Sequence, residues 1–122
     1  MKNINRVTLM GHIVNDPEIK KTKTGISVTS FSLATNNEWR DNEGNLKKSA
    51  DFHRIVAWEK LAEIVCKYLK KGSPIYLEGR LTNRSYEGKD KINYFVTEIQ
   101  AKDINILKWD SKKTIETVEL TA

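Results

Sequence analysis

Aromatic and basic side chains alternate with apolar ones in two segments of this chain. In the first segment, a cation and two rings fall at even-numbered positions, namely Phe52, Arg54 and Trp58. In the second, the same parity is shared by Arg80, Arg84 and Tyr86. Side chains alternate across a strand, so each segment is expected to bury its apolar row and to expose its rings and cations.

Exposed rings beside guanidinium groups suit a flat, anionic ligand. Single-stranded nucleic acid meets this description, because bases stack on rings and phosphates bind cations. We therefore predict Arg54 and Arg84 as phosphate ligands and the following rings as base-stacking residues: Trp39, Phe52, Trp58 and Tyr86. The alternatives are structural: Phe52 could belong to the core, Trp58 could cover the end of the fold, and the arginines could simply be solvated.

Size and composition are typical of one compact domain. The chain has 122 residues, of which 39% are hydrophobic and 30% charged, and no apolar run approaches the roughly 18 residues of a membrane span. The N-terminal stretch lacks the apolar region and cleavage site of a signal peptide, so a cytoplasmic location is expected. A net charge of +5 is compatible with a nucleic-acid partner without proving one.

The hydrophobic pattern predicts an all-β protein with one helix. Extended segments are expected over residues 4–14, 18–23, 26–35, 51–58, 74–83 and 91–101, with a short final piece over 103–107. A change of apolar parity between Val28 and Phe31 predicts a bulge or a strong bend. Residues 36–50 are polar and predict a mobile excursion with a turn at 42–45, whereas helical spacing predicts a helix over 59–71, with Gly72 as its C-cap.

The order of these elements along the chain indicates the class of fold. Three strands, a helix and two further strands are what a five-stranded OB-fold Greek-key barrel requires. Gly11 and Gly79 lie inside strands, where glycine often marks a tight bend. Periodicity alone also allows other small barrels.

Eight short stretches carry a family resemblance through their order and spacing, and the match as a whole covers about residues 3–107. They are Asn5-Arg-Val-Thr-Leu-Met-Gly11, Asp16-Pro-Glu18, Phe31-Ser-Leu-Ala-Thr35, Trp39-Arg40, Asp51-Phe-His-Arg-Ile-Val56, Lys60-Leu-Ala-Glu63, Tyr68-Leu-Lys-Lys-Gly72 and Tyr76-Leu-Glu-Gly-Arg-Leu81. Together they resemble the bacterial single-stranded DNA-binding protein (SSB) family. Phe52 and Tyr86 depart from it, since many members have tryptophan at these positions.

The resemblance implies an OB fold, a homotetramer and non-enzymatic, sequence-tolerant binding of single-stranded DNA in replication, recombination and repair. It implies a nucleoid-associated cytoplasmic protein without a cofactor or metal. By position, it assigns base stacking to the four rings named above, and phosphate contacts to Arg6, Lys20, Arg54, Lys60, Lys71 and Arg84. His53 and Tyr76 match positions of subunit contacts.

The resemblance also divides the chain. Residues 1–108 are expected to form the OB-fold single-stranded-DNA-binding domain, and residues 109–122 a short C-terminal tail. The family commonly ends in an acidic tip that recruits replication and repair proteins. Here the last residues are mixed in charge and form no acidic cluster, so recruitment of such partners through the tail is not expected.

Three other functions are alternatives to single-stranded DNA binding. A dimeric adaptor resembling primosomal replication protein B is disfavoured by the full set of four rings. An enzyme such as a nuclease is disfavoured because Asp51, Glu78 and Glu98 form no recognisable metal-binding pattern, and no zinc-ligand spacing is present. An RNA-binding protein stays open, since stacking and phosphate contacts do not by themselves detect a 2′-hydroxyl.

Overall fold

The computed structural model describes residues 1–109 and 115–120 of the chain. It contains seven strands and one helix: β1 Val7–Ile13, β2 Lys20–Lys21, β3 Ser27–Arg40, β4 Leu46–Trp58, α1 Glu59–Tyr68, β5 Pro74–Glu87, β6 Asn93–Trp109 and β7 Ile115–Leu120. β2 is shorter than the expected strand over 18–23. The expected piece over 103–107 is part of β6, and β7 lies within the segment expected to be a tail.

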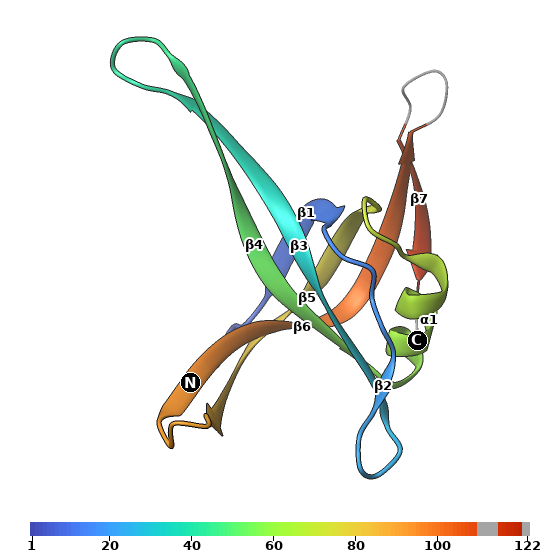
Figure 1. Cartoon of the computed structure of the whole chain (residues 1–122). Coiled ribbons are helices and arrows are strands. Elements are labelled where there is room, and N and C mark those ends of the chain that lie inside the picture. The colour runs from blue at the N-terminus through green and yellow to red at the C-terminus, as the bar shows by residue number, and fades with distance from the viewer. Residues whose placement is uncertain (110–114, 121–122) are drawn as a thin grey trace.

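Five of the strands close into a barrel in the order β1-β5-β6-β4-β3, with β3 returning to pair with β1. Neighbours in the barrel are antiparallel except β4 and β6, which pair in parallel through Ile55 and Ile99. β2 pairs with β3 and β7 pairs with β6, and neither of these two strands is part of the closed barrel (Figure 1). This topology confirms the predicted five-stranded OB-fold barrel with one helix.

The barrel interior is filled by aliphatic side chains that alternate along the strands. Ile13, Leu33, Ile55, Leu77 and Ile104 are all fully buried. α1 adds Leu61, Ala62 and Val65 to this core, as its helical spacing predicts.

The helix ends three residues earlier than predicted. Leu69 takes an extended conformation, so α1 stops at Tyr68 and not at Lys71. Gly72 is therefore not a C-cap. Its φ of +93° belongs to the next turn, where its N–H donates to the carbonyl of Ile13 over 2.7 Å.

β3 and β4 form one long ribbon without a bulge. Their register is continuous from Val28 opposite Trp58 to Arg40 opposite Leu46, so the bulge predicted near Val28 is wrong. Small polar residues at inward positions produced the misleading pattern. Thr29, for example, is buried, and its hydroxyl donates to the carbonyl of Glu18 over 2.8 Å.

The outer part of this ribbon, residues 36–50, is the long arm (Figure 1). The strands expected to end at residue 35 and to resume at residue 51 are wrong in these bounds, because β3 continues to Arg40 and β4 begins at Leu46. Only the turn is confirmed: the Asp41 carboxylate accepts the backbone N–H groups of Glu43 and Asn45, each over 2.9 Å. Nearly all arm side chains are exposed, so the arm contributes surface and no core.

β5 and β6 also project beyond the barrel as a second arm, residues 83–97 (Figure 1). At the barrel, their register shifts between Glu78 and Gly79. A Cβ atom on Gly79 would lie 2.2 Å from the carbonyl oxygen of Gln100, and one on Gly11 would lie 2.1 Å from that of Ala34. Both glycines thus occupy points where two backbones approach closely.

Candidate nucleic-acid interface

The outward face of β4 carries the first row of predicted residues. Phe52, Arg54 and Trp58 are exposed there, and Phe52 is 66% exposed. Their neighbours on β3 include Ser32, which lies opposite Arg54. Such small side chains leave the guanidinium and the rings uncovered, which argues against a core position for Phe52.

Two adjoining hollows lie on this face, with volumes of about 280 and 310 Å³, and they share Arg54 and Arg84. Lys20 and Trp58 also line the first, and Tyr86 also lines the second. We call the combined surface the central groove. It brings together five of the predicted DNA-binding residues from β2, β4 and β5: Lys20, Arg54, Trp58, Arg84 and Tyr86.

A buried carboxylate holds the two arginines in place. Glu98, on β6, is 6% exposed; it accepts a hydrogen bond from Nε of Arg84 over 2.7 Å and another from Nε of Arg54. Burial raises the pKa of Glu98, but the hydrogen bonds and charges of the two arginines outweigh it and hold that pKa below its usual value. The same contact raises the pKa of Arg84.

The cluster of Arg54, Glu98 and Arg84 keeps a net positive charge of one. Each guanidinium has five N–H donors, and both arginine side chains are half-exposed. Donors are therefore left for a phosphate without breaking the contacts to Glu98. The carboxylate fixes the direction of both cations, which lowers the entropy lost when an anion binds.

Tyr86, at the far end of the groove, is paired with a second ring. Tyr94 lies opposite it on β6, and the two rings stack with centroids 5.6 Å apart and planes 24° apart. The guanidinium of Arg84 lies 5.7 Å from the Tyr86 centroid. Tyr94 was not predicted; it faces Tyr86 across the turn that joins β5 to β6.

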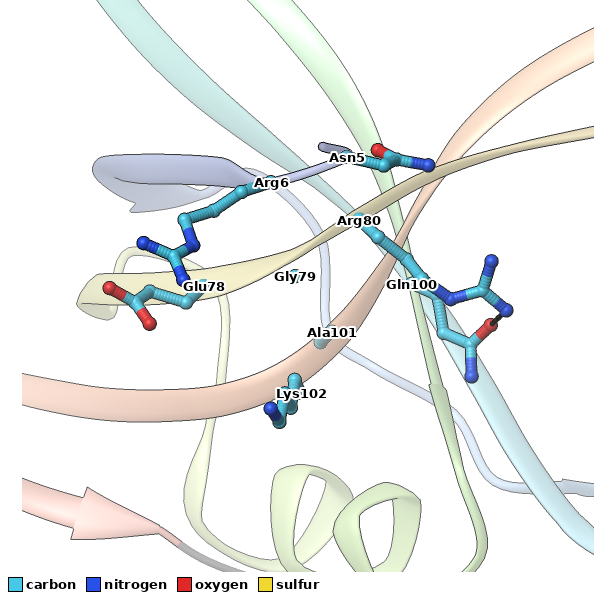
Figure 2. Close-up of a pocket in the computed structure, with 8 residues that line it drawn as sticks. All are labelled: Asn5, Arg6, Glu78, Gly79, Arg80, Gln100, Ala101 and Lys102. Atoms are coloured by element: carbon cyan, nitrogen blue, oxygen red, sulfur yellow. Dashed lines mark hydrogen bonds between the residues drawn. The ribbon is translucent and has the colours of Figure 1, made fainter. Parts of the chain in front are cut away.

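Arg6 lies in a separate polar hollow of about 370 Å³ (Figure 2). Asn5 fixes this segment to β5, since its side chain donates to the carbonyl of Leu81 and accepts its N–H, each over 2.9 Å. Arg80 also lines the hollow, and its guanidinium donates to Gln100 over 3.0 Å. Arg80 and Arg84 share a parity on β5, so the polar hollow continues the row of cations along that strand.

Other predicted residues lie away from the central groove. Trp39 is exposed on the long arm, where it pairs with Lys47. By alternation it occupies the opposite face of the ribbon from Phe52. Lys60 is exposed in the first turn of α1, and Lys71 lies in the turn after the helix. The roles assigned to these side chains stay predictions.

The two residues matched to subunit contacts lie on different sides of the barrel sheet. His53 is half-buried on β4, and its Nε2 shares a hydrogen bond of 2.9 Å with the hydroxyl of Thr35. Tyr76 is half-buried on β5, and its hydroxyl donates to the carboxylate of Glu78 over 3.3 Å. His53 thus has a partner within its own chain.

Within residues 1–109 and 115–120, no three His, Cys, Asp or Glu side chains come together as a metal site would require. The same part of the chain contains no helix with the length and apolar composition of a membrane span.

Several known proteins are similar to this chain in sequence or in structure. A single-stranded DNA-binding protein 1 from Chlorobaculum tepidum is 46% identical over 107 residues, which cover 87% of this chain and 66% of that protein. A single-stranded DNA-binding protein from Xanthomonas campestris is 41% identical over 87% of this chain and 62% of its own length. This chain therefore spans somewhat less than two thirds of these relatives.

A solved structure described as a Plasmodium falciparum SSB complex with ssDNA superposes with a TM-score of 0.80 at 35% identity, covering 88% of this chain and 98% of that one. The sequence model of the single-strand binding protein family matches residues 4–107, which include β1, β3, β4 and β5, most of β6 and both arms. The chain belongs to the single-strand binding protein family.

Proposed function

We propose that this protein binds single-stranded DNA without sequence preference and without catalysing a reaction. The observation that carries the proposal is the central groove, where Arg54 and Arg84 lie between the rings of Trp58 and Tyr86. The relatives named for single-stranded DNA binding, and the similar chain solved with ssDNA, support the same ligand.

Stacking and charge make separate contributions to this binding. Across single-strand-binding OB folds as a class, one stacked base is worth about 1–3 kcal/mol, a general value and not one obtained from this structure. Every base has a π-face, so stacking on Trp58 or Tyr86 tolerates any sequence. Phosphate contacts release counterions, so the affinity should fall as salt rises.

The wider roles belong to the same proposal. We assign the protein to DNA replication, recombination and repair, in the nucleoid-associated cytoplasm, as a homotetramer with His53 and Tyr76 at subunit contacts. Family membership supports these assignments. Residues 1–108 would form the DNA-binding domain.

A fluorescence titration tests the DNA-binding proposal. Poly(dT) should quench the tryptophan emission of the wild-type protein, and matching duplex DNA should bind weakly. Trp58→Leu and Tyr86→Leu should each lower the affinity for poly(dT) about tenfold, as expected for the loss of one stacked base. Tyr68→Leu is the matched control, because Tyr68 is an exposed ring on α1 away from the groove.

Two results would contradict the proposal. Equal binding to poly(dT) and duplex DNA, without quenching and abolished by salt, would mean that charge alone is responsible. Equal losses for Tyr68→Leu and Trp58→Leu would mean that the groove is not the binding surface. Competition with poly(U) tells DNA from RNA: a tighter complex with poly(U) would assign the groove to RNA.

A further inference from the structure

Tyr94 is a ring of the second arm whose position is constrained from several sides. Its hydroxyl donates a hydrogen bond to the carboxylate of Asp90, which also accepts the backbone N–H of Ile92 over 3.1 Å. This contact lowers the pKa of Asp90 and raises that of Tyr94. The ring and the turn are therefore joined through one side chain.

The turn itself is built close against this ring. The N–H of Gly88 donates to the carbonyl of Ile92 over 2.9 Å, which closes the turn. A Cβ atom on Gly88 would lie 2.6 Å from Cε2 of Tyr94, so only glycine leaves room for the ring where it stands. Tyr94 is thus held by Asp90 and packed against Gly88.

From this fixed position Tyr94 stacks on Tyr86. Tyr86 also borders the central groove together with Arg54, Arg84 and Val96, whereas Tyr94 is not among the residues that line that hollow. One part of the Tyr86 ring is therefore covered by a neighbour, while another part borders the surface where DNA is proposed to bind.

We propose that Tyr94 is a positioning residue, which holds the ring of Tyr86 in the orientation that stacks on a base. The inference rests on the proposed binding of single-stranded DNA. An aromatic pair is worth about 0.5–1.5 kcal/mol beyond its area burial. Removing the Tyr94 ring frees Tyr86 to rotate, so part of its stacking contribution is lost as conformational entropy when DNA binds.

A double-mutant cycle tests this role with poly(dT) as the probe. Tyr94→Leu should lower the affinity about three- to tenfold in the wild-type background. In a Tyr86→Leu background it should cause no further loss, because the ring that Tyr94 positions is gone. The dependence of affinity on salt should not change, since no cation is removed. Tyr94→Phe keeps the stacked ring and should restore most of the affinity.

Two further variants separate positioning from a general effect on folding. Gly88→Ala removes no ring but places a Cβ against Tyr94, so it should reproduce the loss seen with Tyr94→Leu at little cost in Tm. Phe95→Leu is the matched control. Phe95 is 81% exposed and, by alternation, lies on the opposite face of the arm from Tyr94. The affinity of Phe95→Leu for poly(dT) should therefore equal that of the wild type.

Each outcome has a definite meaning. Additive losses for Tyr94→Leu and Tyr86→Leu would overturn the inference and make Tyr94 a base contact in its own right. Unchanged affinity for Tyr94→Leu, or a loss for Phe95→Leu as large as that for Tyr94→Leu, would also overturn it. If the wild-type protein itself fails to bind poly(dT), the proposed function fails, and the positioning role falls with it.

Discussion

At the scale of single residues, Glu98 organises the cationic part of the groove. It is a buried carboxylate between two half-exposed arginines from different strands. A buried charge is costly unless it is paired, and here each oxygen accepts from a guanidinium. The carboxylate thus holds the two half-exposed guanidinium groups close to each other, and it cancels one of their two positive charges.

Glu98→Gln should therefore destabilise the fold. The variant leaves two guanidinium groups close together without a counter-charge. Because both arginines are half-exposed, solvent screens part of their repulsion, and we expect a loss of about 1–2 kcal/mol in the free energy of unfolding. Urea denaturation at neutral pH measures this difference. Glu87→Gln, at an exposed position at the end of β5, is the control and should stay within about 0.5 kcal/mol.

The pH dependence of that difference follows from the lowered pKa of Glu98. The ionised carboxylate stabilises the fold fully above its ordinary pKa of 4.5, and this contribution is lost as the pH falls through the lower, folded value. The gap in stability between wild type and Glu98→Gln should therefore shrink below about pH 4.5. A gap that stays constant between neutral and acid pH would show that the ionised form of Glu98 is not what stabilises the protein.

The sequence predicts some residues of this groove and misses others for a physical reason. Alternation along one strand predicts the shared face of Phe52, Arg54 and Trp58, because a strand has a period of two. Glu98 is 44 residues from Arg54, and no local pattern joins them. Tyr94 was missed because the strand was expected to begin at residue 91, whereas β6 begins at Asn93 and its register places Tyr94 opposite Tyr86.

At the scale of elements, the long arm can be removed without touching the core. Thr35 and Asp51 lie opposite each other at its base, so an Asn-Gly turn in place of residues 36–50 would close the ribbon. Affinity for poly(dT) should fall severalfold, because Trp39 is lost, while Tm should change little. The deleted segment is neutral, with three acidic and three basic side chains: Glu38, Asp41, Glu43, Arg40, Lys47 and Lys48. Unchanged affinity would exclude the arm from DNA binding.

The barrel depends on close contacts between backbones. An alanine at Gly11 would place its Cβ 2.1 Å from the carbonyl oxygen of Ala34, and a paired strand cannot give way as a side chain can. Gly11→Ala should cost about 3 kcal/mol in urea denaturation. Gly44→Ala is the control: it has no atom within 4 Å, so only its φ of +81° opposes the substitution, by about 1 kcal/mol. Equal losses would mean that β1 and β3 can separate.

The strands of the long arm could not be predicted from the sequence pattern. The barrel strands alternate between buried and exposed residues, and the helix has an apolar stripe, so both were predicted. In the long arm, both faces meet solvent and the apolar signal disappears. Its strands are set by register with each other, from Asn36 opposite Ala50 to Arg40 opposite Leu46. That information lies in the pairing of two segments and not in either one.

At the scale of the whole molecule, the outer surface of the barrel carries an exposed methionine beside a half-buried tyrosine. Met10 on β1 is 57% exposed and lies opposite Tyr76 on β5. Methionine and tyrosine are both enriched in interfaces between proteins. A second copy of the chain would cover both side chains, which supports the proposed assembly.

Sedimentation equilibrium of the wild-type protein should give four copies per particle. Tyr76→Ala should shift the population toward smaller species as the protein is diluted, because an aromatic anchor in an interface contributes more than most contacts.

His53→Ala should have the same effect, provided that His53 meets a partner as well as Thr35. If His53→Ala stays tetrameric at low concentration while its Tm falls, then His53 acts within its own chain, through the hydrogen bond that joins β4 to β3. Tyr68→Ala, on α1, is the matched control and should leave the particle mass unchanged. A wild-type protein that sediments as a monomer would refute the proposed tetramer, and the exposure of Met10 would then need another explanation.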